Sequence, residues 1–143
     1  KIENNFLKDL NSLKILKLKS NLIERIDTGV FSHTKIEILN LENNNIYHLK
    51  DNVFYGLEKY LKRLNLSHNK IQLVKRKNFH ILNQLVYLYL DNNQISTIDE
   101  GSFDELYNLK DLTLNNNMIF KINFEMLFSK LEFLESLDLK SND

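Results

Sequence analysis

An eleven-residue pattern, L-x-x-L-x-L-x-x-N-x-I, recurs along nearly the whole of this chain and constrains it more than any other feature. It occupies residues 13–23, 36–46, 61–71, 85–95 and 109–119, and a sixth copy begins at Leu134 and reaches Asp143. The asparagines of successive copies are 23, 25, 24, 24 and 25 residues apart. Repetition this regular predicts a stack of similar structural units in which each unit contacts mainly its neighbours.

The spacing of leucines inside each copy predicts one short strand per unit. In the fourth copy, Leu88 and Leu90 are two residues apart, so both side chains point to the same side of a strand. Tyr87 and Tyr89 must then point to the other side. A single copy cannot bury its leucines alone, and stacked copies therefore predict a parallel sheet over a continuous apolar core.

The asparagine of each copy stands where the chain must leave its strand, which predicts a structural role. Asparagine tolerates tight turns, and its carboxamide can bond to backbone groups. A chain that is simply rich in asparagine is the alternative, but the fixed phase against leucine favours a hydrogen-bonded ladder. The expected members are Asn21, Asn44, Asn69, Asn93, Asn117 and Asn142.

The segments that return from one strand to the next carry a regularly placed phenylalanine. We expect these rings to stack on the convex side of the solenoid, within loops that contain a turn of helix or 3-10 turns and are too short for a full helix. The chain has no proline and three glycines, so nothing marks a linker, and residues 1–143 are expected to form one domain. The phenylalanines are Phe31, Phe54, Phe79, Phe103 and Phe128.

From about residue 6 to residue 143, these copies resemble leucine-rich repeats of the roughly 24-residue class, as in Toll-like receptors, chaoptin-type adhesion proteins and insect leucine-rich immune proteins. The resemblance implies an α/β solenoid with short parallel strands on a concave face. It also implies an extracellular or cell-surface recognition module of the innate-immunity receptor type. Such proteins usually close their ends with cysteine-stapled caps, and this chain has no cysteine. We therefore expect a fragment of a longer protein, or a chain whose ends are covered by a partner.

Charge is balanced overall but unevenly distributed. Residues 1–80 hold 15 Lys and Arg against 8 Asp and Glu, whereas residues 81–143 hold 4 against 11. This gradient is either drift at solvated positions or a guide for oriented docking, including homo- or hetero-oligomers. A neutral, half-acidic chain is a poor match for nucleic acid. No apolar run approaches the 18 or so residues of a membrane span, so no membrane insertion is expected.

The strand positions that point away from the core predict the ligand-binding surface. Tyr87 and Tyr89 are its best candidates for anchors, although tyrosine is also common on sheet surfaces for its strand propensity alone. Ile15 and Ile38 are apolar where solvent is expected, which indicates either a small binding patch or a surface covered by further N-terminal repeats. The predicted concave-face residues are Lys17, Asn40, Arg63, Tyr87, Tyr89, Asp91, Asp111 and Thr113.

The sequence offers no catalytic or metal-binding motif, so we expect no enzyme, cofactor or metal. The four histidines, His33, His48, His68 and His80, lack metal-ligand spacing. We expect Asp91 and Asp111 to remain too well solvated on an open sheet for their pKa values to be perturbed. Asn65, in Asn65-Leu66-Ser67, is the single glycosylation sequon.

These observations favour a non-catalytic recognition module that binds a protein ligand through the concave sheet. Two alternatives remain open at this point. One is a structural or adhesive role through self-association, and the other is the role of a protein-interaction scaffold in the cytoplasm.

Overall fold

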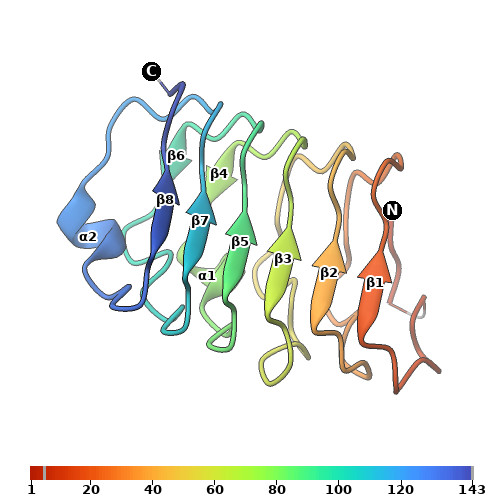
Figure 1. Cartoon of the computed structure of the whole chain (residues 1–143). Coiled ribbons are helices and arrows are strands. Elements are labelled where there is room, and N and C mark those ends of the chain that lie inside the picture. Colours follow the sequence, from red (N-terminus) through yellow and green to blue (C-terminus); the bar gives the residue numbers. More distant parts are fainter. Residues whose placement is uncertain (5, 143) are drawn as a thin grey trace.

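Six short parallel strands lie side by side in chain order and form one sheet in the computed structural model, which describes residues 1–4 and 6–142 (Figure 1). Each return segment passes behind the sheet before the next strand begins. The predicted leucine-rich repeat solenoid is therefore confirmed. The strands are β1 (Ile15–Lys17), β2 (Ile38–Asn40), β3 (Arg63–Asn65), β5 (Tyr87–Tyr89), β7 (Asp111–Thr113) and β8 (Ser136–Asp138).

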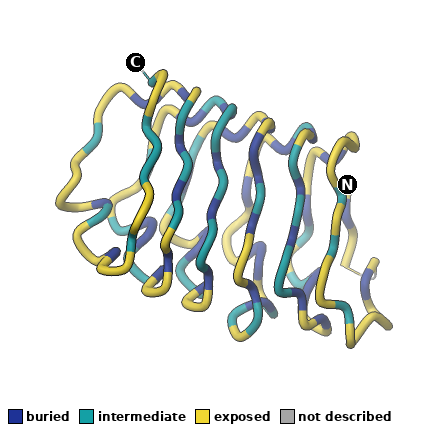
Figure 2. The backbone as a smooth tube through the Cα atoms, in the orientation of Figure 1, coloured by how far each residue is buried: buried dark blue, intermediate teal, exposed yellow. Residues whose placement is uncertain are grey.

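Equivalent positions of successive repeats are aligned across the sheet without any shift of register. Arg63, for example, pairs with Tyr87 and Tyr87 with Asp111. The central leucines of β2, β3, β5 and β7 are fully buried, whereas the residues that flank them are partly or largely accessible. Figure 2 shows this alternation along the strands. One side of the sheet thus lies on the core, and we call the other side the concave face.

The conserved phase of asparagine corresponds to a hydrogen-bonded ladder between repeats. The Oδ1 of Asn93 accepts a bond from the Ile71 backbone N–H at 3.0 Å, and its Nδ2 donates to the carbonyls of Leu66 and Leu90, each at 3.0 Å. Asn44, Asn69, Asn117 and Asn142 bond to the preceding repeat in the same way. Asn21 differs, because its hydrogen bonds go to the carbonyls of Leu18 and Lys19 in its own turn.

The residue just before each ladder asparagine has a left-handed backbone conformation. The φ angles lie between 53° and 58° at Ser20, Asn43, His68, Asn92, Asn116 and Ser141. Asparagine tolerates this conformation better than most residues do. The runs of asparagine in this chain therefore combine a turn-forming residue with a ladder residue, and the general richness in asparagine has a conformational cause.

The phenylalanines of the return segments form one continuous stack behind the sheet. Neighbouring rings from Phe31 to Phe128 have centroids between 6.0 and 6.3 Å apart and lie nearly parallel. The first four rings are fully buried. This phenylalanine stack and the leucines of the sheet make up the core, as the sequence predicts.

The convex side contains two short paired strands in addition to the expected loops and helical turns. Strand β4 (Leu73–Val74) pairs in parallel with β6 (Thr97–Ile98), and α1 (Arg76–Phe79) and α2 (Phe124–Phe128) are short α-helices. Asn78 supports α1, because its Oδ1 accepts from the Lys75 backbone N–H at 2.7 Å while its Nδ2 donates to the Leu49 carbonyl at 3.0 Å. These elements depend on contacts with the neighbouring repeat. The single turns of helix agree with the sequence, whereas the pairing of β4 with β6 was not expected.

The ladder makes a quantitative prediction about stability. Asn93→Leu removes a buried carboxamide that makes four hydrogen bonds to the backbone, and it leaves the Ile71 N–H without its acceptor, so we expect a loss of about 1–3 kcal/mol. Asn21→Leu is the matched control, because within residues 1–4 and 6–142 the side chain of Asn21 bonds only to its own turn. Urea unfolding measures both variants. Equal midpoints for the two variants would show that the cross-repeat bonds contribute nothing.

The phenylalanine stack makes a second prediction. Phe79→Ala leaves a cavity in a fully buried stack and should cost about 3–5 kcal/mol. Phe120, with 73% of its surface exposed, is the control ring, and Phe120→Ala should change little. Because each repeat contacts mainly its neighbours, hydrogen exchange should rise first around Phe54, Phe79 and Phe103. A uniform rise along the chain would contradict this account.

Candidate functional site

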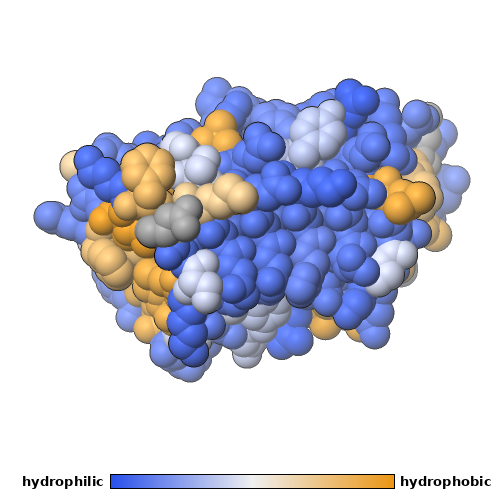
Figure 3. All heavy atoms as spheres, turned by 90° about the horizontal axis from the view of Figure 1, so that it is seen from above, coloured by the Kyte–Doolittle hydropathy of each residue, from blue (hydrophilic) through white to orange (hydrophobic). Residues whose placement is uncertain are grey.

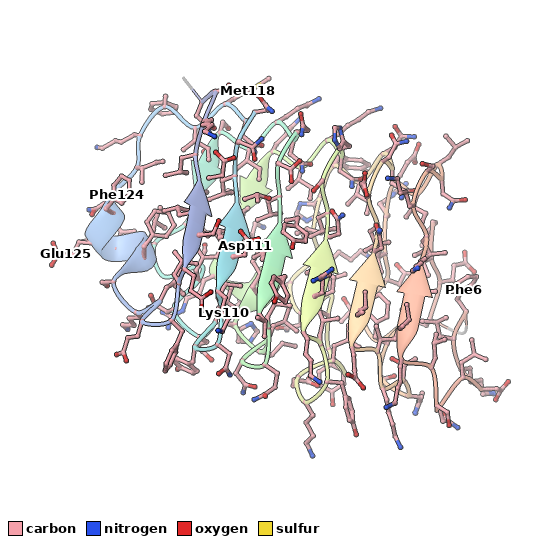
Figure 4. The ribbon with its side chains drawn as sticks, viewed as in Figure 1. Phe6, Lys110, Asp111, Met118, Phe124 and Glu125 are labelled. Carbon is pink, nitrogen blue, oxygen red and sulfur yellow. The ribbon has the colours of Figure 1, made fainter. Side chains whose placement is uncertain are left out.

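The sheet brings all eight predicted concave-face residues onto one surface. They stand in three rows that cross the strands, so that neighbours within a row come from adjacent repeats. Six strands about 4.8 Å apart give this surface a width of roughly 24 Å. Asp111 is visible on β7, on the side of the sheet that faces the viewer in Figure 4. One row holds Arg63, Tyr87 and Asp111, and a second holds Lys17, Asn40, Tyr89 and Thr113. Asp91 belongs to the third row, two residues after the end of its strand.

The centre of the surface is an aromatic and cationic cluster. The guanidinium of Arg63 lies 4.5 Å from the centre of the Tyr87 ring, a cation–π geometry. Tyr87 and Tyr89 are half-buried between their neighbours on the face. Partial burial raises the pKa of the Tyr89 hydroxyl, so this group stays protonated and able to donate a hydrogen bond. The cluster is therefore positioned before any ligand arrives.

Asp91 is the centre of a polar network that joins three repeats. Its Oδ1 accepts from the Ser67 hydroxyl at 2.6 Å and from the Thr113 hydroxyl at 2.9 Å, and its Oδ2 accepts from Asn92 Nδ2 at 2.7 Å. Partial burial disfavours the charged form, but these bonds together outweigh it and hold the pKa of Asp91 below its usual range. The expectation that an open sheet leaves Asp91 unperturbed was wrong, and the lowered pKa argues against acid–base work.

The N-terminal part of the concave face is hollowed into a pocket of about 290 Å³. Its apolar lining comes from Ile15, Ile38 and Tyr89, and its polar lining from Lys17, Asn40, Arg63 and Asn65; Leu39, whose side chain is in the core, contributes its backbone. The side chain of Ile15 is half exposed there. The two isoleucines that face away from the core thus belong to one concave depression and lie beside two cations.

Asn65 lies at the middle of the concave face and lines the same pocket. Its Oδ1 accepts from the Ser67 backbone N–H at 2.9 Å, and its Nδ2 lies 3.3 Å from Glu42 Oε2. Ser67 is buried, and its hydroxyl is bound to Asp91. A glycan on Asn65 remains a prediction, and it would project over this surface.

Ion pairs along one edge of the sheet were missed at the sequence level. Glu37 lies between Lys62 at 3.0 Å and Lys14 at 3.2 Å, and hydrogen bonds from these two ammonium groups lower its pKa. Lys110, labelled in Figure 4, bonds to Glu135 at 2.6 Å. The signal was present, because all five residues occupy the second position of the repeated pattern, where charges of opposite sign face each other in adjacent repeats. Such exposed pairs add little stability.

Two further kinds of site receive no support from the described residues. Within 1–4 and 6–142, no three His, Asp or Glu side chains gather as metal ligands would. Neither of the two helices in this part of the chain has the length and hydrophobicity to cross a bilayer.

Comparison with protein families matches the leucine rich repeat model to residues 34–95 and 84–143. The chain belongs to the leucine-rich repeat family. No catalytic family was found, and no protein of curated function is close enough in sequence to match. The family assignment agrees with the fold, with the ladder and with the phenylalanine stack described above.

Solved structures of Toll-type receptors share this fold. TLR13, in its complex with ssRNA13, is 28% identical with a TM-score of 0.91 over 98% of this chain. Drosophila Toll, in its glycosylated complex with Spatzle, is 26% identical with a TM-score of 0.86 over 94% of it. A second Toll–Spatzle structure, at 24% identity and a TM-score of 0.80, supports the fold alone. The chain spans 20%, 19% and 23% of these three chains, about a fifth of their length.

The Asp91 network predicts a pH-dependent contribution to stability. Asp91→Asn should cost about 1–3 kcal/mol at pH 7, because a charged acceptor with three donors is lost. The folded pKa is below the usual 3.8, so the contribution is present above pH 3.8 and disappears as the pH falls through the lowered folded value. Urea unfolding of wild type and variant at several pH values measures this. A stability difference between wild type and variant that is the same at every pH would contradict this account.

Proposed function

We propose that this chain is a non-catalytic recognition module that binds a protein ligand through its concave face. The observation that carries the proposal is the Arg63, Tyr87 and Tyr89 cluster, which presents aromatic and cationic groups at the centre of the concave face. Tyrosine and arginine are the residues most often found at the energetic centre of protein interfaces. They are held here on strands, not on loops.

The rigidity of the solenoid supports this proposal. The ladder asparagines and the phenylalanine stack fix the strands, and the contact between Arg63 and Tyr87 restricts both side chains. A surface that is ordered before binding loses less conformational entropy when a ligand covers it. Its width of roughly 24 Å suits a loop, a helix or a small domain of a partner.

The relatives favour a protein ligand and an extracellular or cell-surface location for this module. Toll is bound to Spatzle, a complex described as a hub in Drosophila development and innate immunity. TLR13 is bound to an RNA instead. The concave face of this chain carries Asp91, Asp111 and Asp138, which would repel a phosphate backbone, and the net charge of the chain is zero. A protein is therefore the better match, in a receptor of the innate-immunity type.

End-to-end self-association is a second candidate function. Hydrophobic residues gather toward the ends of the solenoid while the surface between them is mostly hydrophilic (Figure 3). Phe6 lies toward the N-terminal end and Phe124 toward the C-terminal end, both more than half exposed (Figure 4). The basic and acidic halves of the chain would attract one another in such a contact. Light scattering across a salt series separates this case, since only this mode gives oligomers that dissociate with salt.

Loss of the two tyrosines should weaken recognition more than it weakens the fold. For a partner selected by screening purified secreted proteins against the chain, Tyr87→Ala with Tyr89→Ala should reduce affinity by about 2 kcal/mol or more. The cost in stability should be about 1 kcal/mol, since both rings are half-buried and Tyr87 loses its cation–π contact. Surface plasmon resonance and urea unfolding measure the two effects.

Tyr55→Ala with Tyr107→Ala is the matched control, because these tyrosines are exposed on the return segments. This second double variant should bind normally. If it abolishes binding while the concave variant retains it, the functional surface lies on the other side of the molecule.

A further inference from the structure

We infer that the pocket at the N-terminal part of the concave face binds an acidic peptide segment of the partner protein. A carboxylate of that segment is held by Lys17 and Arg63, and an adjacent apolar side chain lies on Ile15 and Ile38. The inference rests on the proposed function and deepens it, because it names the chemistry of the ligand at one part of the same surface.

The apolar floor of the pocket comes from three strands. Ile15 and Ile38 are direct partners in the register of β1 and β2, so their side chains stand next to each other on the concave face. The Tyr89 ring of β5 lines the pocket as well. An aliphatic pair beside an aromatic ring offers a surface for one large apolar side chain. The pocket volume of about 290 Å³ is enough for such a group together with a carboxylate.

The polar groups of the pocket are donors and cations. No carboxylate lines it, although acidic side chains are common elsewhere on the face. Lys19 is already paired with Glu42 at 2.8 Å. By contrast, neither Lys17 nor Arg63 takes part in any ion pair within residues 1–4 and 6–142. These two charges are therefore available to an anionic ligand.

Arg63 is also oriented before binding. Its guanidinium lies over the Tyr87 ring, and this contact restricts the movement of a side chain that lines the pocket. Lys17 stands two strands away, about 10 Å along the sheet. A peptide carboxylate between them, or two neighbouring carboxylates, would make charge-assisted hydrogen bonds with both.

A peptide fits this surface better than a polyanion does. Two free cations beside an aliphatic floor match one or two carboxylates next to an apolar side chain. A nucleic acid or an anionic bilayer would extend its charge over Asp111 and Asp138, on the C-terminal half of the same face. The acidic part of the segment must accordingly lie over β1 to β3.

The experiment is a selection from a random eight-residue peptide library displayed on phage. The chain is produced in bacteria so that Asn65 carries no glycan. The expected binders place Asp or Glu next to a large apolar residue. Synthetic copies should bind Lys17→Ala with Arg63→Ala at least about tenfold more weakly than wild type, since two charge-assisted contacts are lost. The control is Arg76→Ala with Lys121→Ala, which removes the same two residue types from the convex side.

A charge-reversed chain gives a positive readout that does not depend on loss of binding. With Lys17→Glu and Arg63→Glu, the same library should yield peptides that place Lys or Arg next to the apolar residue. Both positions are exposed, and urea unfolding checks that the fold is kept. Single-stranded RNA and vesicles of phosphatidylcholine with phosphatidylserine serve as competing probes, and neither should bind.

Several results would overturn the inference. These are a library without enriched binders, binders whose composition does not respond to the charge reversal, or RNA or vesicle binding that requires Lys17 and Arg63. If the selected peptides fail to bind the variant with Tyr87→Ala and Tyr89→Ala while their composition does not change with the charge reversal, this inference fails while the proposed function stands. If binders are lost only with Arg76→Ala and Lys121→Ala, both fail.

Discussion

The carboxamide of one asparagine per repeat is the interaction on which the rest of this molecule depends. Asn93 bonds to its own turn through the Leu90 carbonyl and to the preceding repeat through Leu66 and Ile71. Because the two repeats share one side chain, neither can slide without breaking buried hydrogen bonds. The register of the strands follows from this, and so does every contact on the concave face. Arg63 meets Tyr87 only because their repeats are aligned to the residue.

The sheet and the core were predictable because their signals are periodic and local. The burial of Leu88 follows from its phase relative to Leu85 and Leu90, and the stacking of Phe79 follows from its recurrence in each repeat. The convex elements were not predictable in the same way. Helix α1 is supported by Asn78, whose Nδ2 donates to the carbonyl of Leu49, a residue 29 positions earlier. No short pattern in the sequence announces a bond over that separation.

The candidate site shows the same division. Alternation along a strand predicts which side chains reach the concave face, but not which of them are free to bind. Lys17 and Lys19 are indistinguishable in the sequence, yet Glu42 neutralises Lys19 while Lys17 has no such partner among the described residues. Asp91 and Asp111 also look alike. Only the structure shows that the carboxylate of Asp91 already accepts hydrogen bonds from Ser67, Asn92 and Thr113.

Stability and the proposed recognition thus depend on different positions of each repeat. The leucines, the asparagine and the phenylalanine hold the solenoid, which leaves the outward strand positions free to vary. TLR13 and Toll share this fold with the chain at 28% and 26% identity, yet one is bound to RNA and the other to Spatzle. Similarity of fold therefore does not carry a ligand from one member to another. In a solenoid, equivalent side chains of successive repeats lie about 4.8 Å apart along the face. The order of charges in the sequence becomes an order in space, here cations beside an apolar pocket and then carboxylates, and a ligand of the proposed kind would have to match that order.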